Sequence, residues 1–286
     1  MNYKTPLILA IVIAIAIIVG ILVFANSHTA NITNNNDSLN YTTIGIIYTY
    51  NISPLVNFVH YYYNNSNISL IPQIVGNGTI RIIVFNETKA IISYFKASSP
   101  LSSLAFYAIN ETLVKHGFKF SQYNTLLYDY KNTTAFGFDG YYFYLVSDNG
   151  TLNTTIMLLK YLYTSQKIFT SQQSENIIAY GNINNNSFTL FSESSQIILK
   201  SNSTLAFNNI TQMLKYFNIT LGNFTAAGKV IFKNSSIIIY SINSTYKGKN
   251  LYIIVGIKNN GNNQTYEVLI LSHNEISINE VFKELS

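Results

Sequence analysis

The pattern in this chain whose residue types and spacing could do chemistry is Asn-x-Ser/Thr, in which x is not proline. An oligosaccharide transferase attaches sugar to the side-chain amide of that asparagine, and the acceptor then lies on the surface of an exported protein. The reversed pattern, Ser/Thr-x-Asn, occurs 10 times, so clustering of polar residues does not explain an excess in the forward direction. The competing explanation is a genome bias that enriches Asn, Ile, Tyr, Ser and Thr together. We count 20 forward sequons, at Asn31, Asn36, Asn40, Asn51, Asn64, Asn67, Asn77, Asn86, Asn110, Asn132, Asn149, Asn153, Asn185, Asn202, Asn209, Asn218, Asn223, Asn234, Asn243 and Asn263.

Acidic residues are the candidates for catalysis, because two neighbouring carboxylates can act as acid and base. Asp129, Asp139 and Asp148 fall within twenty residues, beside expected strands. Asp139-Gly140 and the segment after Asp148 also have the composition of turns, and we favour that interpretation. The chain contains neither Gly-x-Ser-x-Gly nor His-Glu-x-x-His. We therefore predict no catalytic residues, and a hydrolase with an acidic pair remains an alternative.

Metal and cofactor sites are not predicted either. The chain has no cysteine, which excludes disulfides, thiolate metal ligands and a thiol nucleophile. His28, His60, His116 and His273 are too far apart in sequence to match any ligand spacing. His116 precedes Gly117 and is placed to interact with the end of a helix.

Tyrosine runs at 61–63 and 141–144 could stack on a sugar or a peptide, because tyrosine gives a wide contact surface at little ordering cost. Packing inside a sheet explains the same runs, since both faces of a strand can be covered. We favour the core interpretation.

The N-terminal segment predicts a membrane anchor. Residues 7–25 carry no charged side chain, and nineteen helical residues span about 30 Å. Lys4 precedes the run and the next cationic side chain is Arg81, which predicts a cytoplasmic N-terminus and an external remainder. Cleavage near Ala25, as in a signal peptide, is the alternative. Under both interpretations, residues 26–286 are exported across the membrane.

The charge content points away from nucleic acid. The formal net charge is +5, but only 10% of residues are charged and the 17 basic ones are scattered. Nucleic-acid binding needs a basic stripe, so we predict no such partner. A sugar coat would keep this surface dispersed at any pH. The composition is similar to that of surface proteins of hot-acid archaea.

An internal repeat is indicated after the polar spacer at 26–40. Residues 104–106 (LAF) recur at 205–207, and 131–134 (KNTT) recur as KNSS at 233–236, offsets of 101 and 102. We therefore expect an anchor at 1–25, a first unit at 41–165 that begins with an extra strand, and a second unit at 166–286.

Each unit is expected to contain a hairpin, a helix, further strands and a closing helix. In the first unit we expect a helix that is capped by Ser99, ends at Gly117 and shares one face among Leu101, Leu104, Ala105, Ala108 and Leu113. The expected strands are 41–50, 79–85, 89–95, 123–130, 134–138 and 141–147, with helices near 55–63 and 153–163. In the second unit we expect strands at 187–191, 196–200, 229–232, 237–242, 251–258 and 265–271, a helix at 204–217, and a short terminal helix capped by Ser277 and Glu280.

These elements predict an α+β fold: a transmembrane helix, then two tandem similar units of antiparallel sheet with packed helices. The predicted function is that of a single-pass, N-glycosylated cell-surface protein that acts by contact with an envelope or membrane partner and has no catalytic role. A ligand-binding component of a transporter is the other alternative.

Overall fold

The computed structural model describes residues 32–33, 39–63, 70–169, 176–204, 225–246, 248–261 and 264–286. The expected membrane anchor at 7–25 and the expected helix at 204–217 lie outside these ranges, apart from residue 204. Within them, no helix is both long and apolar enough to cross a bilayer.

The described elements are fifteen strands and five helices. The strands are β1 Ile32–Thr33, β2 Thr42–Thr49, β3 Val75–Phe85, β4 Thr88–Ala97, β5 Lys119–Tyr123, β6 Leu126–Lys131, β7 Thr134–Phe138, β8 Tyr142–Asp148, β9 Ile177–Ile183, β10 Asn186–Glu193, β11 Gln196–Ser201, β12 Thr225–Lys233, β13 Ile237–Tyr246, β14 Lys249–Asn259 and β15 Thr265–Ser272. The helices are α2 Ser53–Tyr63, α3 Ile71–Ile74, α4 Leu101–Lys115, α5 Leu152–Thr164 and α7 Ile278–Leu285.

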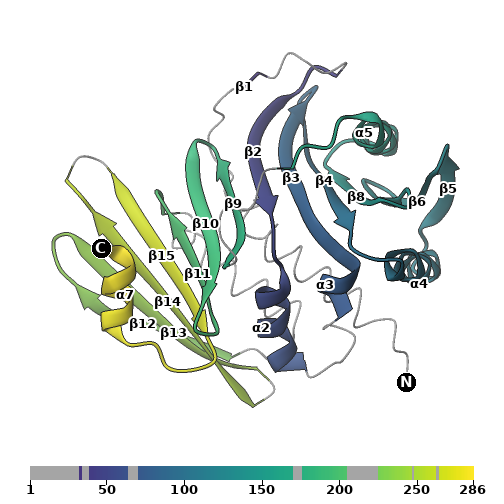
Figure 1. Ribbon diagram of the computed structural model, residues 1–286. Helices are drawn as coiled ribbons and strands as arrows, with labels where there is room; N and C mark the ends of the chain where they lie inside the picture. Colours follow the sequence, from purple (N-terminus) through teal and green to yellow (C-terminus); the bar gives the residue numbers. More distant parts are fainter. Residues whose placement is uncertain are drawn as a thin grey trace.

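All the strands belong to one sheet, whose hydrogen-bonded neighbours are antiparallel (Figure 1). Apart from β1, which pairs with β2, the order is β12-β13-β14-β15-β11-β10-β9-β2-β3-β4-β8-β7-β6-β5. The α+β prediction with antiparallel pairing is thus confirmed for the described residues.

The strand order is the same on both sides of the central β2–β9 pair. From β2 outward it runs β2-β3-β4-β8-β7-β6-β5, and from β9 outward β9-β10-β11-β15-β14-β13-β12. In each half a hairpin is followed by a four-strand meander whose last strand pairs with the hairpin. The two halves meet in an antiparallel ladder in which Ile47 faces Gly181.

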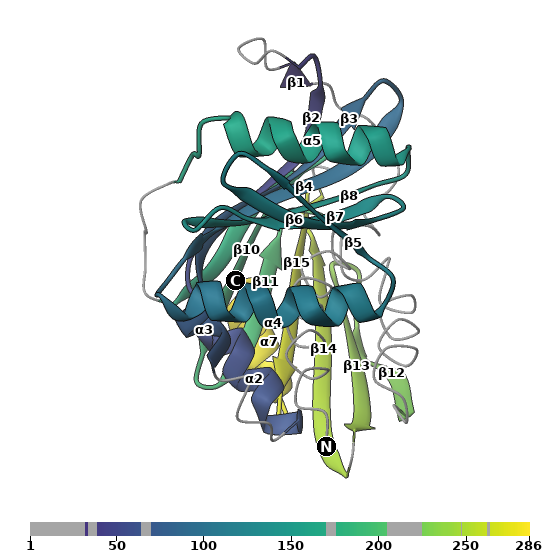
Figure 2. The ribbon, with the colours of Figure 1, turned by 90° about the vertical axis from the view of Figure 1, so that its right-hand side faces the viewer.

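Helices cover both faces of the sheet. Successive strand residues point to opposite sides, so apolar side chains on each face need a covering helix. Phe106 of α4 stacks on Phe136 and Phe138 of β7, with ring centroids 5.7 and 5.4 Å apart. Ala135, which precedes Phe136 and points to the other face, lies in the cluster that includes Leu158 of α5. Figure 2 shows α4 and α5 on either side of the β5–β8 strands.

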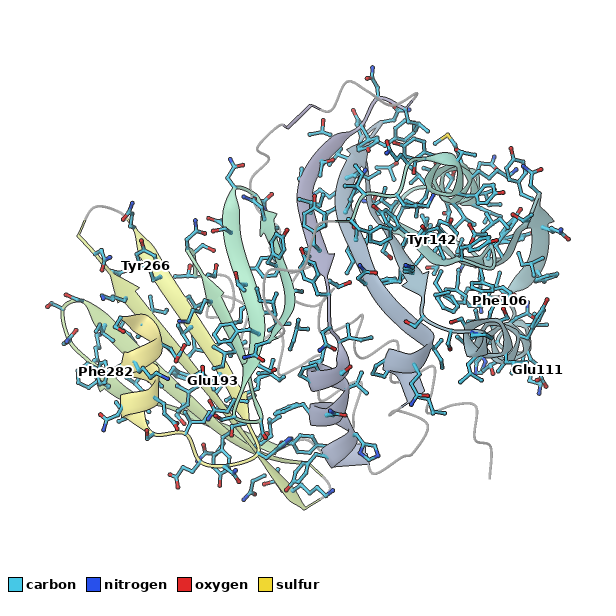
Figure 3. The ribbon with its side chains drawn as sticks, in the orientation of Figure 1. Phe106, Glu111, Tyr142, Glu193, Tyr266 and Phe282 are labelled. Carbon is cyan, nitrogen blue, oxygen red and sulfur yellow. The ribbon has the colours of Figure 1, made fainter. Side chains whose placement is uncertain are left out.

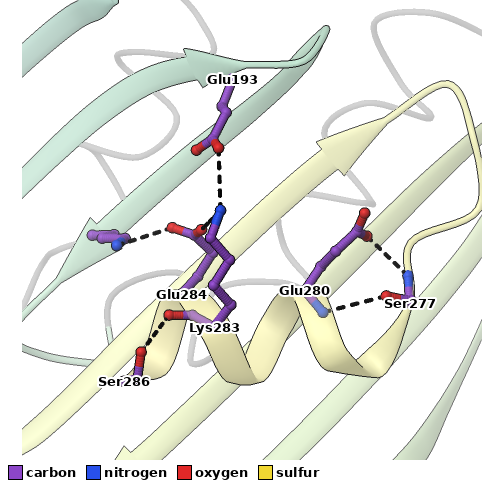
Figure 4. A network of polar contacts seen from close by, with 7 residues as sticks. Glu193, Ser277, Glu280, Lys283, Glu284 and Ser286 are labelled. Atoms are coloured by element: carbon purple, nitrogen blue, oxygen red, sulfur yellow. Dashed lines mark hydrogen bonds and ion pairs between the residues drawn. The ribbon is translucent and has the colours of Figure 1, made fainter.

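The second half buries its terminal helix α7 on the face that α5 covers in the first half. Val281 and Leu285 pack on Ile254 and Ile270, and Gly256 leaves the space for them. The predicted capping box is confirmed: the Glu280 amide donates to Ser277 Oγ and the Ser277 amide donates to Glu280 Oε2 (Figure 4).

Ion pairs fasten α7 to the neighbouring hairpin. Lys283 Nζ lies 3.3 Å from Glu193 Oε1, and Lys200 Nζ lies 2.9 Å from Glu284 Oε2. Figure 4 shows this network at the end of β10. Most of these side chains are exposed, so each pair contributes at most about 1 kcal/mol.

The expectations for α4 were wrong in two respects. Ser99 does not cap the helix: its Oγ donates to Gln73 O, and Pro100 occupies the N-cap without a side-chain bond. Leu101 and Leu104 are exposed, at 45% and 67%. Ala105 of the expected face is buried, and Ser102, Phe106, Ile109 and Thr112 form the rest of the buried face.

Two further local expectations also differ from the structure. The strand expected at 123–130 is divided by a turn at Asn124, where φ is 53°, so it forms the end of β5 and most of β6. The matching segments 131–134 and 233–236 occupy different positions in their meanders. The first joins the second and third strands, and the second joins the first and second strands.

Candidate functional site

The sequon asparagines of the described residues lie at the surface. Of the 20, twelve are described; nine of these are exposed, three are partly buried, and none is buried. The exposed ones are Asn40, Asn86, Asn132, Asn149, Asn153, Asn185, Asn202, Asn234 and Asn243. The partly buried ones are Asn51, Asn77 and Asn110. Asn31, Asn36, Asn64, Asn67, Asn209, Asn218, Asn223 and Asn263 lie outside the described residues.

Three exposed sequons lie at the same ends of the central strands. Asn40 precedes β2, Asn86 lies in the β3–β4 turn, and Asn185 lies in the β9–β10 turn. Pairing of Thr42 with Val84 and of Gly45 with Ile183 places these three ends side by side. They are at the top of Figure 1.

The row of exposed sequons at these strand ends continues toward β5. Asn149 follows β8, and its Oδ1 accepts a hydrogen bond from the Lys89 amide at the start of β4, at 2.8 Å. Asn132 lies in the β6–β7 turn, beside the end of β8, since the Asp148 amide donates to the Thr133 carbonyl. Asn153 is in the first turn of α5, directly beyond β8.

The row also continues toward β12. Asn202 follows β11, and its amide donates to Ser187 O at the start of β10. Asn234 follows β12, and the neighbouring Ser236 carbonyl accepts from the Asn259 amide at the end of β14. We call these eight positions the sequon edge: Asn40, Asn86, Asn132, Asn149, Asn153, Asn185, Asn202 and Asn234.

The opposite strand ends carry few described sequons. Asn51 and Asn77 lie there, and both are partly buried. The turns at 124–125, 139–141 and 194–195 contain none. Helices α2, α3 and the start of α4 adjoin these ends (Figure 1). Asn243, which is exposed, lies in β13 three residues before the same end of that strand, and Asn110 lies inside α4.

Turn geometry accounts for asparagine at several edge positions. Asn86, Asn132 and Asn185 have φ values of 44°, 51° and 65°, which asparagine tolerates better than most residues. No hydrogen bond among the described residues engages the Nδ2 of these three side chains. The turn does not require Ser or Thr two residues later: Asn124 has φ 53° and is followed by Thr125 and Leu126.

The three aspartates considered for catalysis have separate partners. Asp139 accepts from the Tyr144 hydroxyl at 2.6 Å and from backbone amides, and Asp148 accepts from the Thr155 hydroxyl at 2.7 Å. They flank β8 at its two ends, about 20 Å apart for seven extended residues. Asp129 is buried under α4. The structure does not bring Asp139 and Asp148 together as an acid–base pair.

Asp129 is nevertheless unusual, and its neighbours in the chain do not indicate its burial. Its side chain is 0% exposed; Oδ1 accepts from Asn110 Nδ2 at 2.9 Å, while Oδ2 has no partner among the described residues. Burial raises the pKa of Asp129 to about 6, and the hydrogen bond from Asn110 opposes the shift.

The described histidines do not gather around a metal position, and the described residues contain no cluster of three His, Asp or Glu able to hold an ion. His116 ends α4, with Nδ1 2.8 Å from Thr112 O, as expected for a helix terminus. His273 stacks on Phe58 and Tyr61 at 4.2 and 4.0 Å. Burial, and then Lys249, lowers its pKa. His28 lies outside the described residues.

The tyrosine runs are divided between core and surface. Tyr62, Phe143 and Tyr144 are buried, whereas Tyr61 and Tyr141 are 43% and 76% exposed. Figure 3 shows Tyr142 among the side chains between α5 and the sheet.

An aromatic box around Lys167 was not predicted. Its Nζ donates to the carbonyls of Leu162, Tyr163 and Ser165 at 2.7–2.9 Å and lies 5.1 Å from the centroid of the Tyr144 ring. Burial lowers the pKa of Lys167 to about 8, and Asp139 opposes the shift. Because the ammonium group of Lys167 donates to carbonyls at the end of α5, we interpret this cluster as a C-terminal cap of that helix.

Comparison with known proteins identifies no family. No family model matches the chain, and no curated protein is found to be similar. Among solved structures, crystal form IV of TP0453 gives a TM-score of 0.34 at 11% identity, covering 89% of this chain and 97% of that one. The apo immunity protein TplEi of the T6SS from Pseudomonas aeruginosa gives 0.24 at 8% identity, covering 75% and 94%. Scores this low carry no argument about fold or function.

Proposed function

We propose that this protein is a single-pass, N-terminally anchored cell-surface glycoprotein that acts by contact and has no catalytic role. The observation that carries the proposal is the sequon edge. Eight exposed sequon asparagines follow one end of the strands across the sheet, whereas three described sequons, at Asn51, Asn77 and Asn243, lie toward the opposite ends. Glycans on that edge would supply the hydration that a chain with 10% charged residues lacks.

Contact is assigned to the opposite strand ends. Sugars would keep other macromolecules away from the sequon edge, whereas the surface of α4 would stay open to a partner, since its sequon Asn110 is partly buried. That surface includes the exposed apolar side chains Leu101, Leu104 and Tyr107 of α4. An envelope protein or a membrane protein is the partner we propose.

The proposed anchor joins the fold at the sequon edge. Residues 7–25 supply the membrane segment, and the spacer 26–40 ends where β2 begins. Because β1 within this spacer pairs with Thr42 and Thr43 of β2, residues 26–31 are left as the free tether, and six extended residues reach at most about 20 Å.

We also propose that the chain arose by duplication, with units at 41–165 and 166–286. The matching strand order on either side of β2–β9 supports this, and so does the placement of α5 and α7 after the last strand of each meander. Neither alternative function gains support: the acidic residues are separate, and the two halves share one hydrogen-bonded ladder.

Protease shaving of intact cells tests the location. A chain with an epitope after Ser286 should lose that epitope to external protease and should migrate more slowly than its sequence mass of 32.2 kDa. The control is the same tagged chain without residues 1–25, which should stay protected and migrate at its sequence mass. Protection of the full chain, or an unmodified mass in the native membrane fraction, would refute the proposal.

A further inference from the structure

The Ser or Thr at the third position of each sequon divides described sites into two groups. The motif requires a hydroxyl two residues after asparagine, so the transferase must reach that hydroxyl as well as the amide. In the transfer, the bond between the anomeric carbon and the phosphate oxygen of a lipid-linked oligosaccharide breaks. A bond from that carbon to asparagine Nδ2 forms, the lipid phosphate leaves, and one amide proton passes to a base of the transferase.

Asn149 and Asn153 make the contrast sharpest, because they are four residues apart and both exposed. The hydroxyl residue of the first, Thr151, is exposed at the N-cap of α5. The hydroxyl residue of the second, Thr155, is 0% exposed. Thr155 Oγ1 donates to Asp148 Oδ2 at 2.7 Å, so this hydroxyl is both covered and engaged.

Asn110 is closed at both of its recognition groups. Its Nδ2, the atom that would receive the sugar, donates to the buried Asp129 carboxyl. The hydroxyl of Thr112 is 8% exposed and donates to Ala108 O within α4. A sugar on this nitrogen would have to enter the contact between α4 and β6.

Asn77 is closed at the hydroxyl. Thr79 is 0% exposed, and its Oγ1 donates to Ile168 O at 3.0 Å. That bond links β3 to the segment after α5, so exposing the hydroxyl requires this segment to leave the sheet.

In the other group, the transferase can reach both the asparagine amide nitrogen and the hydroxyl. Asn86, Asn132 and Asn185 lie in turns, and their hydroxyl residues Thr88, Thr134 and Ser187 are partly or fully exposed. None of these three hydroxyls donates a hydrogen bond to another described residue.

We propose that N-linked oligosaccharide is added to the folded chain at the open sequons, Asn86, Asn132, Asn149 and Asn185 among them, and that Asn77, Asn110 and Asn153 stay unmodified. The inference rests on the proposed glycoprotein function and deepens it, because it states which acceptors the fold permits. Local opening of the first turn of α5 would be needed to modify Asn153. We expect its occupancy to be at least about tenfold below that of Asn149.

The test is site-by-site glycopeptide mass spectrometry of the full chain purified from its own membranes, with electron-transfer fragmentation to place sugar on single asparagines. Sugar on Asn149 with none on Asn153, Asn110 or Asn77 is the expected result. Equal occupancy of Asn149 and Asn153 would overturn the inference and leave the glycoprotein function standing. Absence of sugar from every site, Asn149 included, would remove both.

Two variants and a peptide separate structure from local sequence. Thr151→Val should lower the intact mass by one oligosaccharide, and Thr155→Val should leave the number of oligosaccharides unchanged. A synthetic peptide of residues 146–158, given to membranes that contain the transferase, should accept sugar at both asparagines because it has no fold. If the peptide accepted no sugar at Asn153, the burial of Thr155 in the fold could not be the reason why Asn153 stays unmodified.

Discussion

Replacing the buried aspartate of β6 with asparagine should remove an acid-dependent gain in stability. Asp129→Asn keeps the size of the side chain and an oxygen that can accept from Asn110, but it cannot titrate. In the wild-type chain the carboxyl is 0% exposed, and one of its oxygens has no partner among the described residues. The protonated form therefore suits the site better than the ion.

The magnitude follows from proton linkage. The pKa of Asp129 is about 6 in the fold, against a reference value of 3.8. Because the folded value is the higher one, the folded chain binds the proton more tightly. Its contribution is complete below about pH 3.8 and disappears as the pH rises through about 6. Between about pH 7 and pH 4 the wild-type chain should gain about 2 kcal/mol from this group.

Urea unfolding of both chains at a series of pH values measures the effect. Other titrating groups are the same in both chains, so the informative quantity is the difference between the two chains. That difference should change by about 2 kcal/mol across the range in favour of the wild type at low pH. Glu111→Gln, an exposed change on α4, is the matched control. Its difference from the wild type in the free energy of unfolding should change by at most a few tenths of about 1 kcal/mol. A wild-type-minus-variant difference that stays flat would refute the reasoning.

Three other changes test the fold. Ser277→Ala removes the cap of α7 and should lower the free energy of unfolding by about 1 kcal/mol in urea titrations; an unchanged value would contradict the role of the capping box. Gly181→Ala should cost at least about 2 kcal/mol in the same assay, because the new Cβ would lie 2.2 Å from the Ile46 carbonyl. Gly45→Ala, whose Cβ meets the end of a flexible side chain at 3.1 Å, should cost less, and the reverse order would count against the β2–β9 register. Lys167→Met should lower thermal stability, since three carbonyls at the end of α5 lose their donor, and an equal melting temperature would show that the aromatic box does not close that helix.

Local patterns predicted most of the strands and the end of the chain. The hairpin at 79–95 has β-branched runs on both sides of Asn86-Glu87, and its turn is found at those two residues. The capping box at Ser277 depends only on residues three apart, and it was also correct. Interactions of this short range can be recognised in sequence because neighbours along the chain fix the geometry.

Features that depend on distant residues were missed. β9 was not predicted, because its sequence, IIAYGNI, contains a glycine and alternates poorly, and the strand is defined by pairing with β2 and β10. The buried face of α4 was misassigned because Ser102 fits under the helix by donating to Ile74 O at 2.7 Å. Larger neighbours such as Leu104 are turned outward.

For the sites, the sequence located the acceptor asparagines but not their accessibility. Nothing in Asn153-Thr154-Thr155 distinguishes it from an open sequon, because the burial of Thr155 depends on Asp148 at the end of another element. The same holds for Asp129, whose partner Asn110 is nineteen residues away.

The position of β2 has a mechanical consequence. This strand is the first long element after the proposed anchor. It pairs with β3 on one side, and with β1 and then β9 on the other. Tension applied by a moving partner or by flow would enter the molecule along the axis of β2. Both ladders would then be loaded in shear, so their hydrogen bonds would share the force and would not open one at a time. A surface protein tethered through its central strand is thereby suited to remaining folded under pull.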